Sequence, residues 1–304
     1  MPARGTRQVA QLSAHDVAIF AVLARYRYLP ADYIHALVGG SFKYLTHRLS
    51  ILSREPNLFL VRPAQQRANA AANHRYLIYE LDQPGIRAVQ DHGLSLQRHR
   101  APASFAHELM ACQILASFEL GARAAAVRLI AWTDILSSQN LPEATRCSAK
   151  PFHIPVRFEG ADAHVVADAQ PFGIERVIGA QRSYYFCPGV EADCGTEPID
   201  ASEFSRSSIA RKFALYLAIE AQGIHRVHFG FPNFYVPFIT TTSARLTSMM
   251  AALNRMTDGR GSKIFLFKNF PAYTSFERPP PPSGRMLTED WQRVGHPRFN
   301  FLAP

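Results

Sequence analysis

Three short helical patterns at the start of the chain constrain its fold most. The first, SAHDVAIFAVLARY at 13–26, opens with a serine cap and repeats apolar side chains at helical spacing. Pro30 breaks that pattern, and residues 31–38 predict a second short helix that ends at Gly39-Gly40. A third helix follows this glycine turn, and the arrangement is typical of a helix-turn-helix, whose last helix enters the major groove of DNA.

The third pattern, SFKYLTHRLSILSRE from residue 41, has two faces. Four apolar side chains are expected to face the core: Phe42, Leu45, Leu49 and Leu52. The polar side chains of the other face are expected to contact the DNA groove or its phosphates, namely Lys43, Thr46, His47 and Arg54.

Two alternating segments at 58–62 and 75–81 then predict a pair of strands, and residues 83–92 predict a closing helix. The polar stretch between the strands, PAQQRANAAANH, is expected to form a wing. Three arginines at this wing are expected to contact the DNA backbone: Arg62, Arg67 and Arg75. The first part of the chain therefore predicts a winged helix-turn-helix.

The charge distribution supports DNA as a partner. Residues 1–100 contain 13 Lys/Arg and 6 Asp/Glu, so they carry +7 of the net charge of +9. A basic module attracts polyanions because each phosphate that it neutralises releases condensed counterions. A basic surface that serves only solubility is the alternative that charge alone leaves open.

Other features exclude some classes of protein. No run of about 18 uncharged apolar residues occurs, and the N-terminal MPARGTRQVAQL lacks the apolar core of a signal peptide. We therefore expect no membrane segment and a cytoplasmic location. The four cysteines form no C-x-x-C pair, which argues against structural zinc.

The polar, basic segment GLSLQRHRAPAS at 93–104 separates two domains. A long helix is predicted at 105–120, followed by short strands at 126–131, 154–158, 164–168 and 182–193, a helix at 204–222, strands at 227–230 and 236–240, a helix at 244–257 and a strand at 263–267. We expect a winged-helix domain at 1–95, a linker at 96–104, an α/β domain at 105–275 and a Pro-rich, irregular tail at 276–304. The fold class is α+β.

Carboxylates gather at two strand ends of the second domain. Asp168 ends the apolar run HVVAD, and Glu191 and Asp193 alternate at the end of another strand-like segment. If these segments pair as neighbouring strands, with QPFGIERVIGAQ as the turn, the acids converge. Two or three carboxylates can hold Mg²⁺, but acids at an exposed sheet edge also protect against aggregation. The spacing alone leaves both interpretations open.

Three segments, VVADAQPF, YYFCPGVEADCGTEPI and SIARKFALYLAI, resemble the replication-relaxation family of plasmid and mobile-element proteins. The resemblance runs over roughly residues 10 to 270. It implies a winged helix joined to a domain related to the PD-(D/E)xK restriction-endonuclease-like fold, with a mixed central sheet.

The resemblance also implies roles for individual residues. Asp168 would be the first acid and Glu191 the second, with Asp193 following it, and these three would hold Mg²⁺ or Mn²⁺. Lys212 would be a displaced nuclease lysine near the scissile phosphate. Glu108, in the helix that opens the domain, would be an additional catalytic acid. The lysine position of an E-x-K motif holds Asp193, which cannot donate a positive charge.

Together these features predict a DNA-binding protein of a plasmid or mobile element that acts in replication, relaxation or mobilisation and carries a degenerate nuclease-like domain. Two alternatives stay open: an active Mg²⁺-dependent DNA endonuclease, and a dimeric winged-helix transcriptional regulator. The expected partners are double-stranded DNA, relaxase or replication proteins and a second copy of the chain.

Overall fold

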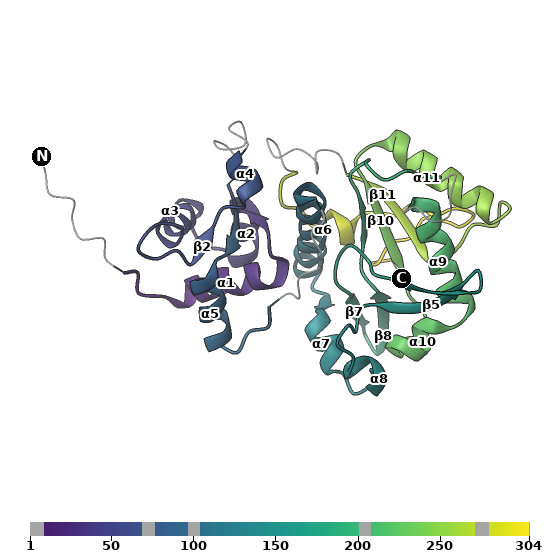
Figure 1. Ribbon diagram of the computed structural model, residues 1–304, viewed down its shortest axis with the longest axis horizontal. Helices are drawn as coiled ribbons and strands as arrows, with labels where there is room; N and C mark the ends of the chain where they lie inside the picture. The colour runs from purple at the N-terminus through teal and green to yellow at the C-terminus, as the bar shows by residue number, and fades with distance from the viewer. Residues whose placement is uncertain (1–8, 69–76, 97–103, 201–207, 271–279, 304) are drawn as a thin grey trace, which may run out of the picture. The chain divides into compact units, whose positions relative to one another are not determined.

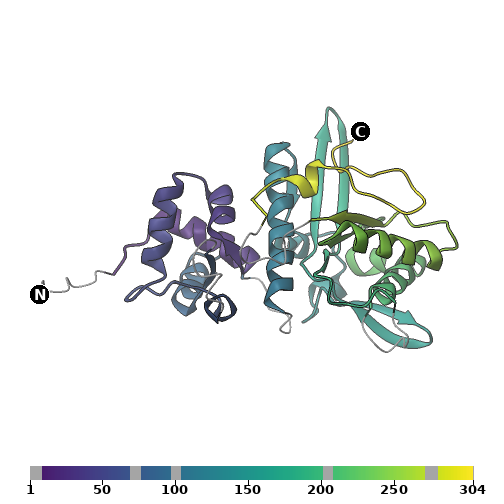
Figure 2. The same ribbon diagram turned by 90° about the horizontal axis from the view of Figure 1, so that it is seen from above.

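The computed structural model describes residues 9–68, 77–96, 104–200, 208–270 and 280–303. The chain divides into two compact units. Unit 1 contains Met1–Ala116 and Ser275–Pro282, and unit 2 contains Ser117–Thr274 and Ser283–Pro304. The division falls inside helix α6, Phe105–Ala124, which is one unbroken helix in Figures 1 and 2. The structure is a mixed α+β protein, as predicted, with small antiparallel and parallel sheets.

Unit 1 begins with three helices and a small sheet. Its elements in chain order are α1 Ala14–Tyr26, β1 Leu29–Pro30, α2 Ala31–Val38, α3 Phe42–Leu52, β2 Leu60–Val61, α4 Ala64–Ala68, β3 Ile78–Leu81 and α5 Gln83–Asp91. The strands form an antiparallel sheet in the order β1-β3-β2. The three predicted helices and the closing helix are present. The predicted strands are shorter than expected, and α4 takes up part of the expected wing.

Local sequence explains how α1 begins and how α3 packs. Ser13 caps α1, and the side chain of Asp16 accepts a hydrogen bond from the Ser13 backbone in return. Leu45 and Leu49 of α3 are fully buried, as predicted. The expectation for Phe42 was wrong, because its side chain is 48% exposed. Phe42 is the first residue of α3. The chain has only just entered the helix there, and this side chain does not lie with the apolar side chains that face the core.

Unit 2 contains most of the strands. Its elements after α6 are β4 Arg128–Ile130, α7 Trp132–Ser137, α8 Glu143–Arg146, β5 Ile154–Phe158, β6 Ala161–Val165, β7 Phe172–Ile178, β8 Gln181–Cys187, β9 Glu191–Asp193, α9 Ile209–Ala221, α10 Ile224–Phe229, β10 Val236–Thr240, α11 Ser243–Met256, β11 Phe265–Asn269 and α12 Arg285–Thr288.

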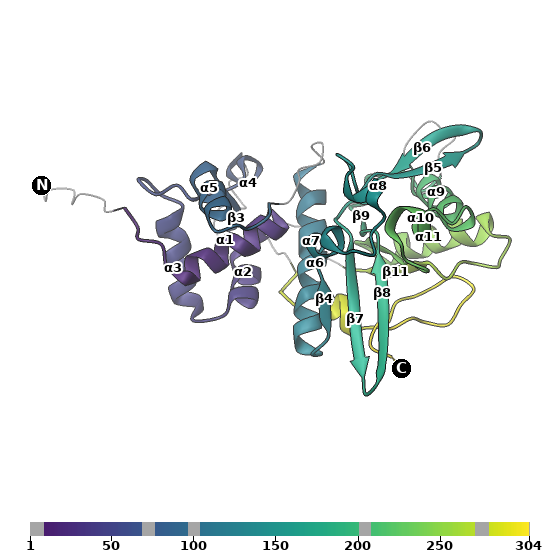
Figure 3. The same cartoon turned by 90° about the horizontal axis from the view of Figure 1, so that it is seen from below.

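The strands of unit 2 change from antiparallel to parallel pairing along the chain. An antiparallel sheet has the order β4-β7-β8, and its long β7–β8 hairpin is visible in Figure 3. Two residues after the bend at Pro188-Gly189, the chain enters β9, which pairs in parallel with β10, and β10 pairs in parallel with β11. The backbone N–H of Tyr235 donates to Phe186 O at 2.8 Å and connects the two sheets. Figure 1 shows α9 and α11 beside β10 and β11.

Three sequence-based expectations for unit 2 were wrong. The segment expected as a turn between the acids is largely strand β7, because FGIERVI pairs along its whole length with β8. The segment before Asp168 pairs with β5 rather than with the strand that holds Glu191. The strand expected at 227–230 is part of helix α10, a six-residue element whose sequence is too short to show a period.

The end of the chain packs into unit 2. The part after residue 282 was expected to be irregular, and it does contain little regular structure beyond α12. Trp291 and Phe301 are nevertheless fully buried, and Trp291 pairs with Phe299 through a β-bridge. Both rings contact Phe118 of α6. This segment therefore contributes buried side chains to the apolar core of unit 2.

Candidate functional site

The ammonium of Lys212 lies among three carboxylates in unit 2. Its Nζ is 2.9 Å from Glu191 Oε2, 3.1 Å from Glu197 Oε2 and 3.4 Å from Asp168 Oδ2. Lys212 belongs to the first turns of α9, whose N-terminus is capped by Ser208. We call these four residues the acid–lysine cluster. It contains Asp168, Glu191 and Lys212, which the family resemblance had assigned to one site.

Backbone contacts bring Asp168 beside Glu191 although their segments are not neighbouring strands. The N–H of Asp168 donates to Val190 O at 2.9 Å, and the N–H of Ala192 donates to Asp168 Oδ2 at 3.0 Å. Gly189 makes this close approach possible: a Cβ atom there would lie 2.3 Å from the carbonyl oxygen of Ala169. Its φ of +149° is also a conformation that residues with a side chain rarely adopt.

Glu191 is the most deeply buried member of the acid–lysine cluster, with 2% of its surface exposed. Tyr216, one turn after Lys212 on α9, donates a hydrogen bond of 2.6 Å to Glu191 Oε1. Burial raises the pKa of Glu191 to about 7, against the opposing effect of the Lys212 charge and with a further rise from Asp168. The carboxyl group therefore changes protonation near neutral pH.

Lys212 stays protonated in this setting. Burial alone would lower its pKa, but the negative charges of Glu191, Asp168 and Glu197 together raise it well above its ordinary value. When all members are ionised, three carboxylates surround one ammonium, so the acid–lysine cluster carries net negative charge. Such a centre attracts a further cation.

Asp193 has different partners from the other acids. Arg245, near the N-terminus of α11, makes a bidentate ion pair with it through Nε and one terminal guanidinium nitrogen. Thr240 of β10 donates to Asp193 Oδ2 at 2.7 Å, and the Gly195 N–H donates to Oδ1 at 3.1 Å. Both carboxylate oxygens of Asp193 are therefore engaged by donors.

The residues fit a divalent metal only in part. Carboxylate oxygens of Asp168 and Glu191 are the hard ligands that Mg²⁺ prefers, and both face the same point, which Lys212 Nζ also approaches. In the part of the chain that the structure describes, no group of three or more His, Cys, Asp or Glu is arranged to hold a metal ion. Asp168 and Glu191 could supply two ligands, and other oxygens would have to complete the shell.

Glu108 lies in unit 1 and pairs with a residue of that unit. Its Oε2 is 2.8 Å from a guanidinium nitrogen of Arg27, which follows α1. The guanidinium also stacks on Tyr28, 4.5 Å from the ring centre. Glu108 thus takes part in the packing of the N-terminal half of α6, while the acid–lysine cluster belongs to unit 2.

The expected DNA-contacting residues of α3 are accessible. Lys43, His47 and Arg54 are exposed, and Thr46 is half-buried with its hydroxyl donating to the Lys43 carbonyl at 3.1 Å. Sequence reasoning missed one feature of this surface, since Tyr44 is 52% exposed beside the basic side chains. The tyrosine in the sequence of this helix is the signal that could have indicated an aromatic side chain on the proposed DNA-contacting surface.

Of the three arginines expected at the wing, only Arg62 has a side chain among the described residues. Arg62 is half-buried, and its Nε donates to Gln66 Oε1 at 3.4 Å, so its side chain is directed toward α4. Arg67 belongs to α4, and its side chain lies outside the described residues. Arg75 also lies outside the described residues.

Sequence reasoning also did not place Arg245 or Glu197 in the site. Arg245 is 52 positions from Asp193 and stands in a helix whose pattern indicates only an amphipathic surface. Glu197 could have been found, because it lies in the segment YYFCPGVEADCGTEPI that carries the family resemblance and also contains Glu191.

Comparisons with protein-family models, with curated proteins and with solved structures find no match to this chain. Among the described residues, no helix is both long and apolar enough to cross a membrane.

Proposed function

We propose that this protein binds double-stranded DNA through unit 1, and that it acts in replication, relaxation or mobilisation of a plasmid or mobile element. The observation that carries the DNA-binding part is the surface of α3, where Lys43 and His47 are exposed together with Tyr44, and Arg54 is exposed just after the helix ends. Cationic and aromatic side chains on one accessible helix suit contacts with phosphates and base edges. The biological role rests on the family resemblance alone.

The architecture of unit 1 supports the proposal that it is a winged helix. Unit 1 contains three helices, α1 to α3, and a small antiparallel sheet. Strand β1, which lies between α1 and α2, pairs with the last strand of the sheet, β3. In this arrangement α2 packs against α3 and Arg48 of α3 pairs with Asp16 of α1, while the side chains of Lys43 and His47 face solvent. A helix held in this manner can enter a major groove.

Unit 2 supports a nuclease-like domain as part of the proposal. An opening helix, an antiparallel set of strands, the acid-bearing strand β9, the lysine-bearing helix α9 and the parallel strand β10 follow each other in chain order. Two acids and one lysine converge from three separate segments. Two carboxylates that can hold a divalent metal beside a lysine that can bind a phosphate suit hydrolysis of a phosphodiester.

Mg²⁺-dependent cleavage of DNA is the second candidate function, and the position of Lys212 favours it. Asp168 and Glu191 would hold the metal, which when bound supplies Lewis-acid polarisation of the phosphodiester. Lys212 would bind and orient the scissile phosphate after leaving its carboxylate partners.

The test of DNA binding is a fluorescence anisotropy titration of the full chain with duplex DNA over a range of salt concentrations. Lys43→Ala and His47→Ala should weaken binding, and loss of a phosphate contact should reduce the salt slope by about one unit. Arg87→Ala, which removes an exposed arginine of α5, is the control and should have a smaller effect. Equal losses for all three variants would contradict a role for α3.

The test of cleavage uses supercoiled plasmid with Mg²⁺ or Mn²⁺. Nicking by the full chain that is lost in Asp168→Ala and in Lys212→Ala would establish an endonuclease. No nicking above the Asp168→Ala level at high protein concentration would leave unit 2 as a degenerate nuclease domain. A symmetric footprint with two half-sites about one helical turn apart would instead favour a dimeric regulator.

A further inference from the structure

We infer that unit 2 has a second ligand site, a pocket for a phosphate ester, formed by α8, the turn before β5, the β5–β6 hairpin and α10. The cavity has a volume of about 380 Å³. Its lining residues are Ala144, Thr145, Ser148, Lys150, His153, Pro155, His164 and His228. None of these residues is a member of the acid–lysine cluster, and none forms one of its ion pairs.

The chemistry of the lining suits an anion. Lys150 contributes an exposed ammonium, and the imidazoles of His153 and His164 lie 6.3 Å apart between ring centres. The hydroxyl of Ser148 adds a neutral donor. Among the described residues that line the pocket, none carries a carboxylate. A bound phosphate would therefore meet positive charge and hydrogen-bond donors without an acidic group opposite it.

The inner wall of the pocket is held by fixed hydrogen bonds. His228 lies within hydrogen-bond distance of Pro151 O through Nε2, at 2.9 Å, and its Nδ1 lies 3.3 Å from Thr145 Oγ1. The Thr145 hydroxyl itself donates to the carbonyl of His228 at 2.6 Å. Burial lowers the pKa of His228, which keeps that imidazole neutral. His228 thus forms part of the pocket wall, and the positive charge of the pocket comes from other lining residues.

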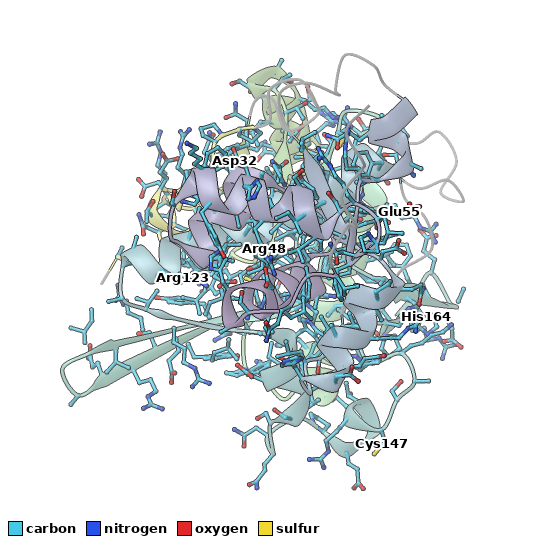
Figure 4. All side chains as sticks on the ribbon, turned by 90° about the vertical axis from the view of Figure 1, so that its left-hand side faces the viewer. Asp32, Arg48, Glu55, Arg123, Cys147 and His164 are labelled. Carbon is cyan, nitrogen blue, oxygen red and sulfur yellow. The ribbon has the colours of Figure 1, made fainter. Side chains whose placement is uncertain are left out.

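The turn that carries the ammonium is also ordered by hydrogen bonds. The backbone N–H of Lys150 donates to Ser148 Oγ at 3.1 Å, and the N–H of His153 donates to the Lys150 carbonyl at 3.1 Å. His164 stands on the neighbouring strand β6, opposite Pro155 in the register of the hairpin, and Figure 4 shows it at the outer surface. Lys150 and His153 from this turn and His164 from β6 are therefore held around one cavity.

A transition metal is the other ligand that histidines suggest, and the lining argues against it. A cation would meet the ammonium of Lys150 at the mouth. The Nε2 of His228 lies 2.9 Å from Pro151 O, and among the described residues no group of three or more His, Cys, Asp or Glu is arranged to hold a metal ion. The histidines of the lining, without a carboxylate or thiolate beside them, therefore do not make the tetrahedral set that zinc uses. The volume instead lies within the range of pockets for small organic ligands.

Two sources can present this chemistry: a free nucleotide, and the phosphodiester backbone of DNA. The experiment therefore uses three probes on the full chain, namely inorganic phosphate, adenosine monophosphate and a short DNA duplex. Binding is followed by the imidazole proton resonances of His153 and His164 in NMR spectra and by calorimetry. The expected result is a saturable shift of the His153 and His164 resonances with at least one probe, separate from any shift of His47 that binding of the duplex to unit 1 causes.

The variants are Lys150→Ala and His164→Ala, both at exposed positions that should not disturb folding. Each should weaken binding of the active probe by about tenfold, the loss expected for one charge-assisted hydrogen bond. Lys263→Ala, an exposed lysine of the same unit outside the lining, should leave it unchanged. Circular dichroism spectra should be the same for all three.

The three probes distinguish the sources. Binding of adenosine monophosphate or phosphate assigns the pocket to a free ligand, and binding of the duplex alone, with losses in both pocket variants, assigns it to DNA backbone. The inference is overturned if none of the probes gives a saturable shift of the His153 and His164 resonances, if Lys263→Ala weakens this binding as much as Lys150→Ala, or if Zn²⁺ binds while all three phosphate probes fail to shift these resonances.

Discussion

Arg245 and Asp193 form a bidentate ion pair that ties the start of α11 to the end of β9. The carboxylate has 2% of its side chain exposed and the guanidinium 18%. Arg245 also donates to the carbonyl of Glu197, so one side chain holds the strand and the loop that follows it. The pair therefore orders the segment that brings Glu197 to Lys212.

Arg245→Ala should destabilise the protein by about 3 kcal/mol, because it leaves the buried charge of Asp193 without its main partner. The measurement is urea unfolding followed by circular dichroism. Arg255→Ala is the matched control, since Arg255 stands on the same helix and pairs with Asp200 where both side chains are more than half exposed. That variant should cost less than about 1 kcal/mol. Equal losses would show that the Arg245 pair is no stronger than a surface pair.

Glu191 makes stability depend on pH near neutrality. Its pKa in the folded protein is about 7, above the value of about 4.5 that it has when exposed. The folded state therefore binds more protons than the unfolded state between these values, and the contribution of Glu191 to stability is lost as pH rises through this window. Glu191→Gln removes the titration.

The variant Glu191→Gln should consequently show a smaller fall in free energy of unfolding between pH 5 and pH 8 than the parent chain. Tyr216→Phe should act in the opposite sense, because Tyr216 donates to Glu191 and its hydrogen bond lowers the pKa of that carboxyl. Denaturant midpoints at several pH values test both. A parallel pH dependence in the parent and in Glu191→Gln would contradict the assignment.

Gly189→Ala should prevent the close approach that places Asp168 beside Glu191. The added Cβ would lie 2.3 Å from Ala169 O and 2.4 Å from Ala167 Cβ, so the backbone must shift. The expected loss is about 3 kcal/mol or more. Gly179→Ala is the control: Gly179 also has a positive φ, of +56°, but a Cβ there meets no atom within 4 Å. A similar loss in both variants would assign the effect to backbone strain alone.

The spacing of apolar residues predicted those helices and strands that pack one of their faces against the core. The helices at α1 and α3 and the strands β5 and β10 lie where their apolar spacing indicated. Phe42 was misplaced because a helix pattern does not show where the first turn leaves the core. Strand β7 was missed because the glycine in FGIERVI favours a turn, and only the pairing with β8 overrides that preference.

The sequence likewise predicted some residues of the candidate site and missed others. The family resemblance placed Asp168, Glu191 and Lys212 in one site, and they lie together, although the strand pairing that was expected to bring the two acids together was wrong. The partner of Asp193 could not be foreseen, because Arg245 comes from a distant helix and nothing in its local pattern points inward. Long-range ion pairs depend on how helices dock, and a single sequence contains no direct signal for that.

Asp16 links the first and third helices of unit 1. It closes the cap of α1 with Ser13, and its two oxygens each accept a hydrogen bond of 2.7 Å from Arg48 of α3, which Figure 4 labels among the helices of unit 1. The side chain of Asp16 is fully buried. Burial opposes ionisation of Asp16, but the bonds from Arg48 and Ser13 outweigh it and lower the pKa below 3.8.

Asp16→Asn should therefore reduce the stability of unit 1 by about 2–3 kcal/mol at pH 7. A carboxyl whose pKa is lowered on folding contributes stability above its unfolded pKa of about 3.8, and this contribution is lost as pH falls through the folded pKa. The difference between Asp16→Asn and the parent chain should accordingly shrink below about pH 4. Thermal unfolding at pH 7, 5 and 3 measures it, with the exposed Asp91→Asn as the control. Because Arg48 fixes α3 through Asp16, the variant should also bind duplex DNA more weakly at pH 7, and unchanged DNA affinity would show that α3 does not depend on this pair.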